Sequence, residues 1–203
     1  MGVFDKKFCG ICGEKIGILG NRKLEDDNLC KKCAALLSPF MTERRKTTLA
    51  EIKQHLAYRE ANKAEVAKFN VSKELGEDTL VLIDETAGKF IVTSSKKWQF
   101  ENPDVIEISQ VSGFDLDIKE TKDEIKMKDS EGKMISFDPP RYDIEYDFYF
   151  TIKVKSTWFS EIKFKLNRNR IEAQNPARYM EYDKKATAIK EALNPNSDTS
   201  KGC

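Results

Sequence analysis

The 203-residue sequence predicts an α+β protein with a small cysteine-rich head, a long connecting helix and an antiparallel β body closed by a C-terminal helix. Three observations support this prediction. Two Cys-x-x-Cys pairs lie near the N-terminus, residues 49–69 contain no Gly or Pro, and apolar and polar residues alternate through much of the remainder. We place the head at residues 1–40, the helical connector at 41–70, the β domain with its helix at 71–193, and a disordered polar tail at 194–203.

The head contains two cysteine pairs of identical spacing, Cys9-Gly10-Ile11-Cys12 and Cys30-Lys31-Lys32-Cys33. A two-residue spacer lets one tight turn aim two thiolates at one point, and four such ligands suit zinc, with Zn–S distances of about 2.3 Å. Gly13 follows the first pair, where a cysteine knuckle often needs a positive φ. A disulfide or a redox Cys-x-x-Cys is the alternative, but a redox motif needs no second pair. We therefore predict one structural Zn²⁺ bound by Cys9, Cys12, Cys30 and Cys33.

The rest of the head is predicted from turn and helix signals. Residues 16–24 predict a short hairpin with a glycine-assisted turn, and residues 32–37 predict the start of a helix that ends before Pro39. A knuckle, a hairpin and a helix bearing the second pair would form a treble clef, whereas a strand in place of the helix would form a zinc ribbon. Nearby lysines favour offset of the cluster's negative charge over a phosphate-binding rim: Lys6, Lys7, Lys31 and Lys32.

The connector is predicted to be a helix from Thr48 to about Phe69. Thr48-Leu49-Ala50-Glu51 matches a capping box. A thin apolar stripe is expected on one face, formed by Leu49, Ile52, Leu56, Ala64 and Ala67. Such a helix packs on the body or pairs with a partner helix. His55 lacks an evident nucleophile or orienting group, so we expect a surface or interface side chain rather than a catalytic base.

The body is predicted to be an antiparallel sheet folded on itself. Alternation or apolar runs mark strands at 80–83, 90–92, 105–108, 114–118, 125–127, 135–137, 148–154 and 162–166. A helix follows, with Asn175 as N-cap and Pro176 in its first turn. This order favours a small barrel or sandwich similar to a pleckstrin-homology or GRAM domain. Trp98 and Trp158 fall outside the alternation, so either is a candidate surface anchor. Lys96 and Lys97 form the one candidate basic loop for binding phosphoinositides, as pleckstrin-like domains often do.

Composition and charge exclude several classes of protein. Charged residues make up 34% of the chain and hydrophobic residues 39%, with no apolar run long enough to span a membrane. Residues 1–70 carry a net charge of +5 and residues 71–203 a net charge of −4, which is too weak to indicate nucleic-acid binding by charge alone. The N-terminus does not resemble a signal peptide. Paired cysteines without an export signal predict a cytoplasmic protein, and Cys203 is expected to be an incidental thiol.

The usual signatures of enzymes are missing from the sequence. It contains no Gly-x-x-x-x-Gly-Lys, no Gly-x-Gly-x-x-Gly after a strand and no Gly-x-Ser-x-Gly. A zinc with four protein thiolates also has no open position to activate water. We therefore expect a protein that is not an enzyme.

The head resembles a known family through Cys9-Gly10-Ile11-Cys12-Gly13-Glu14-Lys15 and Asn28-Leu29-Cys30-Lys31-Lys32-Cys33. This is an uncharacterised bacterial four-cysteine domain of unknown function that often precedes a β-rich domain. The head is also similar to the treble-clef zinc module of the ClpX unfoldase, which binds adaptors and substrates. The resemblance implies a small intracellular bacterial protein whose four cysteines bind a structural zinc.

These observations predict a non-enzymatic zinc protein that acts as an adaptor for another, unidentified protein. One alternative is a nucleic-acid-binding zinc protein that uses the basic N-terminal segment and Arg44-Arg45-Lys46. Its affinity would fall steeply with salt. A second alternative is a peripheral protein that binds membrane lipid through the β domain and sediments with anionic liposomes.

Overall fold

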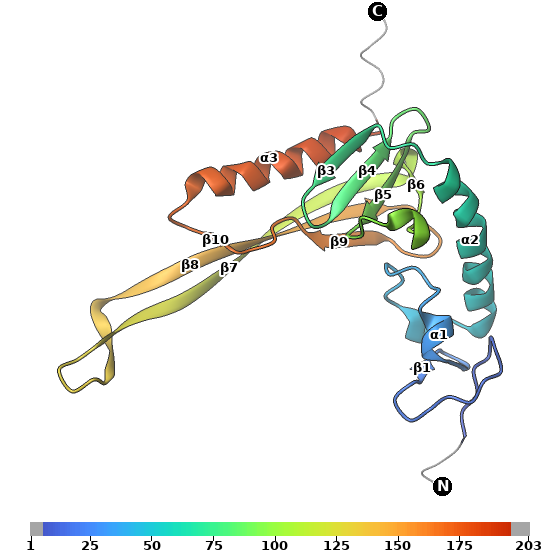
Figure 1. Ribbon diagram of the computed structural model, residues 1–203, viewed down its shortest axis with the longest axis horizontal. Coiled ribbons are helices and arrows are strands. Elements are labelled where there is room, and N and C mark those ends of the chain that lie inside the picture. Colours follow the sequence, from blue (N-terminus) through green and yellow to red (C-terminus); the bar gives the residue numbers. More distant parts are fainter. Residues whose placement is uncertain (1–5, 196–203) are drawn as a thin grey trace, which may run out of the picture.

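The computed structural model describes residues 6–195 and shows a small head, a long helix and a β body, with a β arm that projects from the body (Figure 1). The head contains β1 (Arg22–Lys23), β2 (Asn28–Leu29), the one-turn helix α1 (Lys31–Ala34) and the 3-10 helix η1 (Arg44–Lys46). Helix α2 (Leu49–Lys68) leads from the head to the body. The fold is therefore a mixture of helices and antiparallel strands, as the sequence predicts.

The head hairpin lies later in the chain than the sequence predicts. Arg22 pairs with Leu29 and Lys23 with Asn28, so the strands are β1 and β2, and residues 16–21 form no strand. The side chains of Ile18 and Leu19 are 91% and 90% exposed, whereas those of Leu24 and Leu29 are fully buried. The prediction of a hairpin at 16–24 is wrong because burial of the two leucines beside the cysteines selects the later pairing.

Helix α2 begins and ends close to the predicted positions, but it buries a different face. Thr48 forms the predicted capping box with Glu51, and the helix ends at Lys68. Ala64 and Ala67, which were predicted to lie on the buried stripe, are exposed. The buried residues of the helix recur every three or four positions and include three polar ones: Ile52, His55, Arg59, Asn62 and Val66. The helix packs on the body as well as on the head.

The body consists of two antiparallel sheets in an open, sandwich-like arrangement. The first sheet has the order β3 (Lys73–Gly76), β4 (Leu80–Asp84), β5 (Lys89–Thr93) and β6 (Ile106–Glu107). In the second sheet β8 (Met134–Val154) is the central strand. It pairs with β7 (Val111–Lys128) along one edge and with β9 (Glu161–Lys165) and β10 (Ile171–Glu172) along the other. The 3-10 helices η2 (Trp98–Phe100) and η3 (Ile108–Gln110) lie before and after β6.

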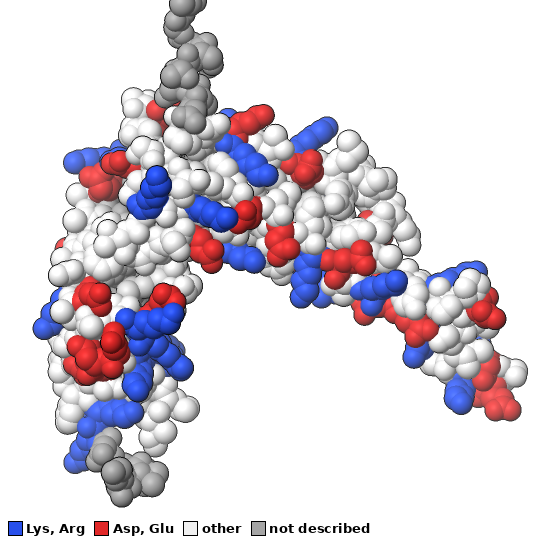
Figure 2. All heavy atoms as spheres, turned by 180° about the vertical axis from the view of Figure 1, so that it is seen from behind, with Lys and Arg blue, Asp and Glu red and all other residues white. Residues whose placement is uncertain are grey.

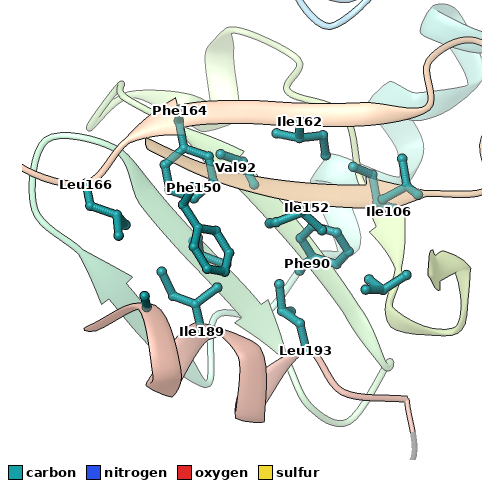
Figure 3. Close-up of a cluster of buried hydrophobic side chains, with 14 of the residues drawn as sticks. Phe90, Val92, Ile106, Phe150, Ile152, Ile162, Phe164, Leu166, Ile189 and Leu193 are labelled. Carbon is teal, nitrogen blue, oxygen red and sulfur yellow. The ribbon is translucent and has the colours of Figure 1, made fainter. Parts of the chain in front are cut away.

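The main core lies between the two sheets and against helix α3 (Pro176–Ala192). Figure 3 shows Phe90 and Val92 of the first sheet facing Phe150, Ile152, Ile162 and Phe164 of the second, with Ile189 and Leu193 closing the cluster. Asn175 caps α3 through a hydrogen bond from the Arg178 amide, and Pro176 occupies the first turn, which confirms the predicted helix. The outer face of the first sheet is also covered: Leu82 and Ile91 pack against Val66 of α2 and against Trp98.

The long strands β7 and β8 merge segments that the sequence pattern separates. The predicted strands 114–118 and 125–127 both belong to β7, and 135–137 and 148–154 both belong to β8. Their distal halves, residues 122–128 and 134–144, pair with each other except at residues 137–140, which oppose no residue of β7, and they pair with no third strand among residues 6–195. Figure 1 shows this ribbon, which we call the β arm, extending well beyond the body.

The two tryptophans are packed rather than projecting. Trp98 is 8% exposed and lies against Phe69, so the prediction of a surface anchor at this position is wrong. Trp158 is half-buried against His55 and Tyr58.

The predicted tail at 194–203 and Cys203 lie mostly outside the described residues, which end at 195.

Candidate metal centre

The structure brings the four predicted ligand cysteines together. The sulfur atoms of Cys9, Cys12, Cys30 and Cys33 all lie within 4.8 Å of one another. The Sγ atoms of Cys12 and Cys30 are 3.7 Å apart. Four sulfurs at about 2.3 Å from one ion stand about 3.8 Å from each other in a tetrahedron. The spacing therefore fits a tetrahedral thiolate site of the kind that zinc occupies.

A tight backbone turn positions the first pair. The amide of Gly13 donates to the Cys9 carbonyl at 2.8 Å, and the amide of Cys9 donates to the Glu14 carbonyl at 2.9 Å. Gly13 has a φ of +71°, as the sequence predicts for the residue after a cysteine knuckle. The amide of Gly10 donates to the Asn28 carbonyl at 2.9 Å, which ties this turn to the segment that precedes the second pair.

The second pair is positioned by the start of helix α1. Cys30 is the N-cap residue, and its sulfur accepts a hydrogen bond from the Cys33 amide at 3.4 Å. Cys33 sits in the single turn of α1, so both sulfurs face the same point. Cys9, Cys30 and Cys33 are buried, whereas Cys12 is exposed. Three of the candidate ligands are therefore shielded from solvent, and the fourth is not.

Two of the four thiols, those of Cys9 and Cys33, have pKa shifts of opposite direction. Burial raises the pKa of the Cys9 thiol, but hydrogen bonds from the backbone of Cys12, Cys30 and Ile11 outweigh burial and lower this pKa to about 6. Burial raises the pKa of the Cys33 thiol, and its sulfur neighbours raise it further. Four adjacent thiolates would accumulate negative charge, which a bound divalent cation would compensate. This donor set fits Zn²⁺, which would act as a structural crosslink.

A small core supports the centre. Cys9, Cys30 and Cys33 pack with five other buried residues of the head and of α2: Ile16, Leu24, Leu29, Leu37 and Ile52. Gly10 is held against the start of the helix, because a Cβ atom there would lie 2.8 Å from the Leu49 side chain and 2.3 Å from Asp27 Oδ2. The first turns of α2 are therefore part of the structural unit that holds the cysteines.

Residues 7–55 match a domain of unknown function (DUF4428). The matched DUF4428 region contains all four cysteines and extends into α2 as far as His55, so it spans the head together with the helical turns that pack against it. No curated protein and no solved structure matches the chain.

A buried polar network, which the sequence prediction missed, joins the DUF4428 region to the body. Arg59 of α2 donates to Asp104 at 2.8 Å, with the side chains 8% and 0% exposed, and also to the carbonyls of Asn102 and Leu36. Ser38 Oγ donates to the other carboxylate oxygen of Asp104 at 2.7 Å. One carboxylate of the body therefore holds the helix and the segment that follows α1.

His55 and Asn62 extend this network along the same face of α2. Asn62 donates to the Pro103 carbonyl at 2.7 Å and accepts from the Val105 amide at 3.0 Å. His55 is fully buried, and its Nε2 accepts a hydrogen bond from the Ser38 amide at 3.0 Å. The interface reading of His55 is therefore correct and the surface reading is wrong. In the sequence, these polar side chains fall on the same helical face as Ile52 and Val66, which indicates a buried face. Polar side chains are normally expected to face solvent, so the pattern was not predicted as buried.

The predicted basic candidates near the metal centre do not converge on it. Lys32 pairs with Glu14 at 3.7 Å on an exposed surface, and Lys6, Lys7 and Lys31 are exposed. Lys96 and Lys97 lie on the loop before η2 and are far along the chain from the cysteines.

None of the helices in residues 6–195 is long and apolar enough to cross a bilayer.

Proposed function

We propose that this protein is a non-enzymatic adaptor in which a zinc-stabilised DUF4428 region and a β body hold the β arm out for a protein partner. The feature that carries the proposal is the β arm itself. An isolated two-stranded ribbon is marginally stable in water. This one nevertheless extends from the body and pairs with no third strand within residues 6–195, although the Ile144 carbonyl accepts from the Ala173 amide and Pro139 and Pro140 interrupt the row of N–H groups on β8. Unpaired strand edges present rows of N–H and C=O groups that readily pair with another chain.

The tip of the β arm adds apolar surface to these free edges. Met127, Met134 and Ile135 are 41%, 53% and 36% exposed, and Met127 pairs directly with Ile135 across the strands. Methionine is flexible and polarisable, so it adapts to different partner surfaces. Figure 2 shows Lys and Arg intermixed with Asp and Glu along the arm, which suits a protein surface better than a polyanion.

The proposal extends to the finer fold of both parts. A knuckle, the β1–β2 hairpin and the one-turn helix that bears the second pair support a treble-clef head over a zinc ribbon. Two four-stranded antiparallel sheets in an open sandwich, with a C-terminal helix packed against their core, support a pleckstrin-homology-like body. The closed set of four thiolates offers no ligand position for water, which supports a non-enzymatic role. Free thiols held for a metal suit a reducing compartment, which supports a cytoplasmic location.

Site-specific photocrosslinking in the native host tests the proposal. A photoreactive phenylalanine analogue replaces Met134 at the arm tip, and in a matched control it replaces Met180, which is 59% exposed on α3. We expect discrete protein adducts from position 134 that are absent from position 180. An adduct with a second copy would identify the partner as the protein itself.

Three results would contradict the proposal. These are the absence of protein adducts from position 134, the same adducts from positions 134 and 180, and adducts from position 134 that consist only of lipid or are removed by nuclease. The last result would favour one of the membrane-lipid or nucleic-acid alternatives.

A further inference from the structure

We propose that Arg22, Arg44 and Arg45 form a binding site for a phosphate group on the head. This site is separate from the cysteine cluster and from the β arm. Arg22 belongs to β1, whereas Arg44 and Arg45 belong to η1, which directly precedes α2. The three residues therefore come from two segments that the fold brings together. Figure 2 shows a group of Lys and Arg side chains gathered on the head.

These three arginines differ from the other arginines of the chain in their partners. Each of the others has an anion or an aromatic ring: Arg59 pairs with Asp104, Arg168 with Asp78, Arg170 with Glu145 and Asp147, Arg178 with Glu181, and Arg141 lies over Phe137. Within residues 6–195, no carboxylate lies within ion-pair distance of Arg22, Arg44 or Arg45. Arg22 donates only to the carbonyls of Leu19 and Asn21.

Arg44 is the most constrained of the three. Its Nε is buried and has no hydrogen-bond partner within the described part of the chain. Burial lowers the pKa of its guanidinium, and the nearby charges of Arg22 and Arg45 lower this pKa further. A half-buried guanidinium among like charges is costly unless an anion offsets the charges and accepts the unpaired N–H groups.

The surrounding backbone holds the two segments at a fixed distance. The Glu25 amide donates to the Thr47 carbonyl at 3.0 Å, which ties the end of β1 to the residue after η1. Nearby acidic groups are engaged elsewhere: Glu43 binds Lys46, Asp26 accepts from the Leu49 amide, and Asp27 accepts from the Asn28 amide. The guanidinium groups are therefore held together without an internal anion to neutralise them.

The chemistry of the three side chains selects the ligand class. A guanidinium presents parallel N–H donors that match two oxygens of a phosphate, and its charge is permanent. Three positive charges also favour a phosphate group, with its several acceptor oxygens, over a single carboxylate. The ligand is either a free phosphate or phosphomonoester, or the phosphodiester backbone of a nucleic acid. All of these present the same tetrahedral group.

Calorimetric titration of the zinc-loaded full chain tests the site, first with inorganic phosphate and then with a single-stranded oligothymidylate. Arg44→Gln and the exposed Arg45→Gln remove one guanidinium each, and Arg168→Gln is the control with the same change in net charge. Because each test variant loses charge-assisted hydrogen bonds to the phosphate, we expect both to weaken binding at least about tenfold. The Arg168→Gln control should bind as the wild type does.

Each outcome bears on the inference. Saturable phosphate binding that depends on Arg44 and Arg45 supports the site. If the oligonucleotide binds more tightly than phosphate, and its binding also depends on Arg44 and Arg45, the ligand is a nucleic-acid backbone. If it does not, the ligand is a free phosphate or phosphomonoester. The inference is overturned if neither probe binds saturably, or if both test variants bind as the control does. Far-ultraviolet circular dichroism of Arg45→Gln verifies that any loss occurs in a folded protein.

Discussion

At the scale of single residues, the four cysteines and Gly13 show how closely local chemistry determines the metal centre. The first Cys-x-x-Cys turn needs only the hydrogen bonds of the Gly13 and Cys9 amides and the positive φ of Gly13, all within six residues of Cys9. The buried members of the body's core all lie at or beyond residue 81, and of the head only Phe40 packs against them, from a partly buried position. The head and the body therefore depend on different sources of stability.

We predict that Cys12→Ser abolishes stoichiometric zinc binding and unfolds the head, while the β body keeps its strand signal. A structural zinc contributes about 10–16 kcal/mol of apparent free energy to folding, and the small head core cannot replace that amount. Elemental analysis, thiol titration and circular dichroism measure the three effects. Cys203→Ser, outside the ligand set, should retain the zinc. Simultaneous loss of the head and the β signal in Cys12→Ser would contradict the prediction.

His55 should make the stability of the protein sensitive to pH. Burial lowers the pKa of His55 to about 4. The charge of Asp104 raises this pKa, and the charge of Arg59 lowers it to a smaller extent. Its Nε2 must remain unprotonated to accept from Ser38. The unfolded chain therefore binds a proton on His55 more readily than the folded protein does. The contribution of neutral His55 to stability is consequently present above pH 6.5 and is lost as pH falls toward 4.

We predict that acidification from pH 6.5 to 4 removes up to about 3 kcal/mol of unfolding free energy through His55. Urea denaturation at several pH values measures this loss. In His55→Gln the free energy at neutral pH should be lower, and its slope over this window should be smaller. Identical slopes for the two proteins would show that other groups control the acid response.

At the scale of secondary-structure elements, α2 and the β arm depart from ordinary amphipathic patterns in opposite ways. Helix α2 buries Arg59 and Asn62, which are usually exposed, because the loop at residues 102–105 supplies their partners. The β arm leaves Met127 and Ile135 in solvent although they alternate as core residues do. In both elements the contacts made elsewhere in the fold decide which side chains are buried.

We predict that the distal β arm can be removed without loss of stability. No side chain in residues 124–142 is buried, so replacing this segment by Asn-Gly would join Asp123 to Asp143 through a two-residue hairpin turn. The melting temperature should change by no more than about 2–4 °C, equivalent to about 1 kcal/mol for a protein of this size. A larger decrease, measured by calorimetry, would show that the β arm is part of the folded core.

At the scale of the whole molecule, a buried ion pair fixes the head and α2 on the body. Asp104 accepts hydrogen bonds from Ser38, Tyr58 and Arg59, so one side chain joins three segments that are distant in the sequence. His55 and Trp158 add an edge-to-face contact with ring centroids 4.8 Å apart. These contacts describe a docked arrangement rather than two parts joined by a flexible linker.

We predict that Asp104→Ala destabilises the protein by about 3–5 kcal/mol, because it leaves the buried Arg59 guanidinium without its anion. The control is Asp78→Ala, which removes an exposed carboxylate 3.6 Å from Arg168, and it should cost less than about 1 kcal/mol. Urea denaturation of both variants measures the difference. Equal effects in the two variants would contradict a structural role for the buried pair.

The sequence by itself determined the features that depend on local chemistry. These are the clustering of the four cysteines, the φ of Gly13, the ends of α2, the start of α3 and most core strands. The sequence failed where burial depends on distant partners. Only the tertiary structure decided that Leu24 and Leu29 select the head hairpin, that Arg59 turns inward, and that β7 and β8 extend into solvent. The physical reason is that local spacing fixes turns, caps and ligand geometry, whereas the cost of burying a polar group depends on the partner that the fold supplies.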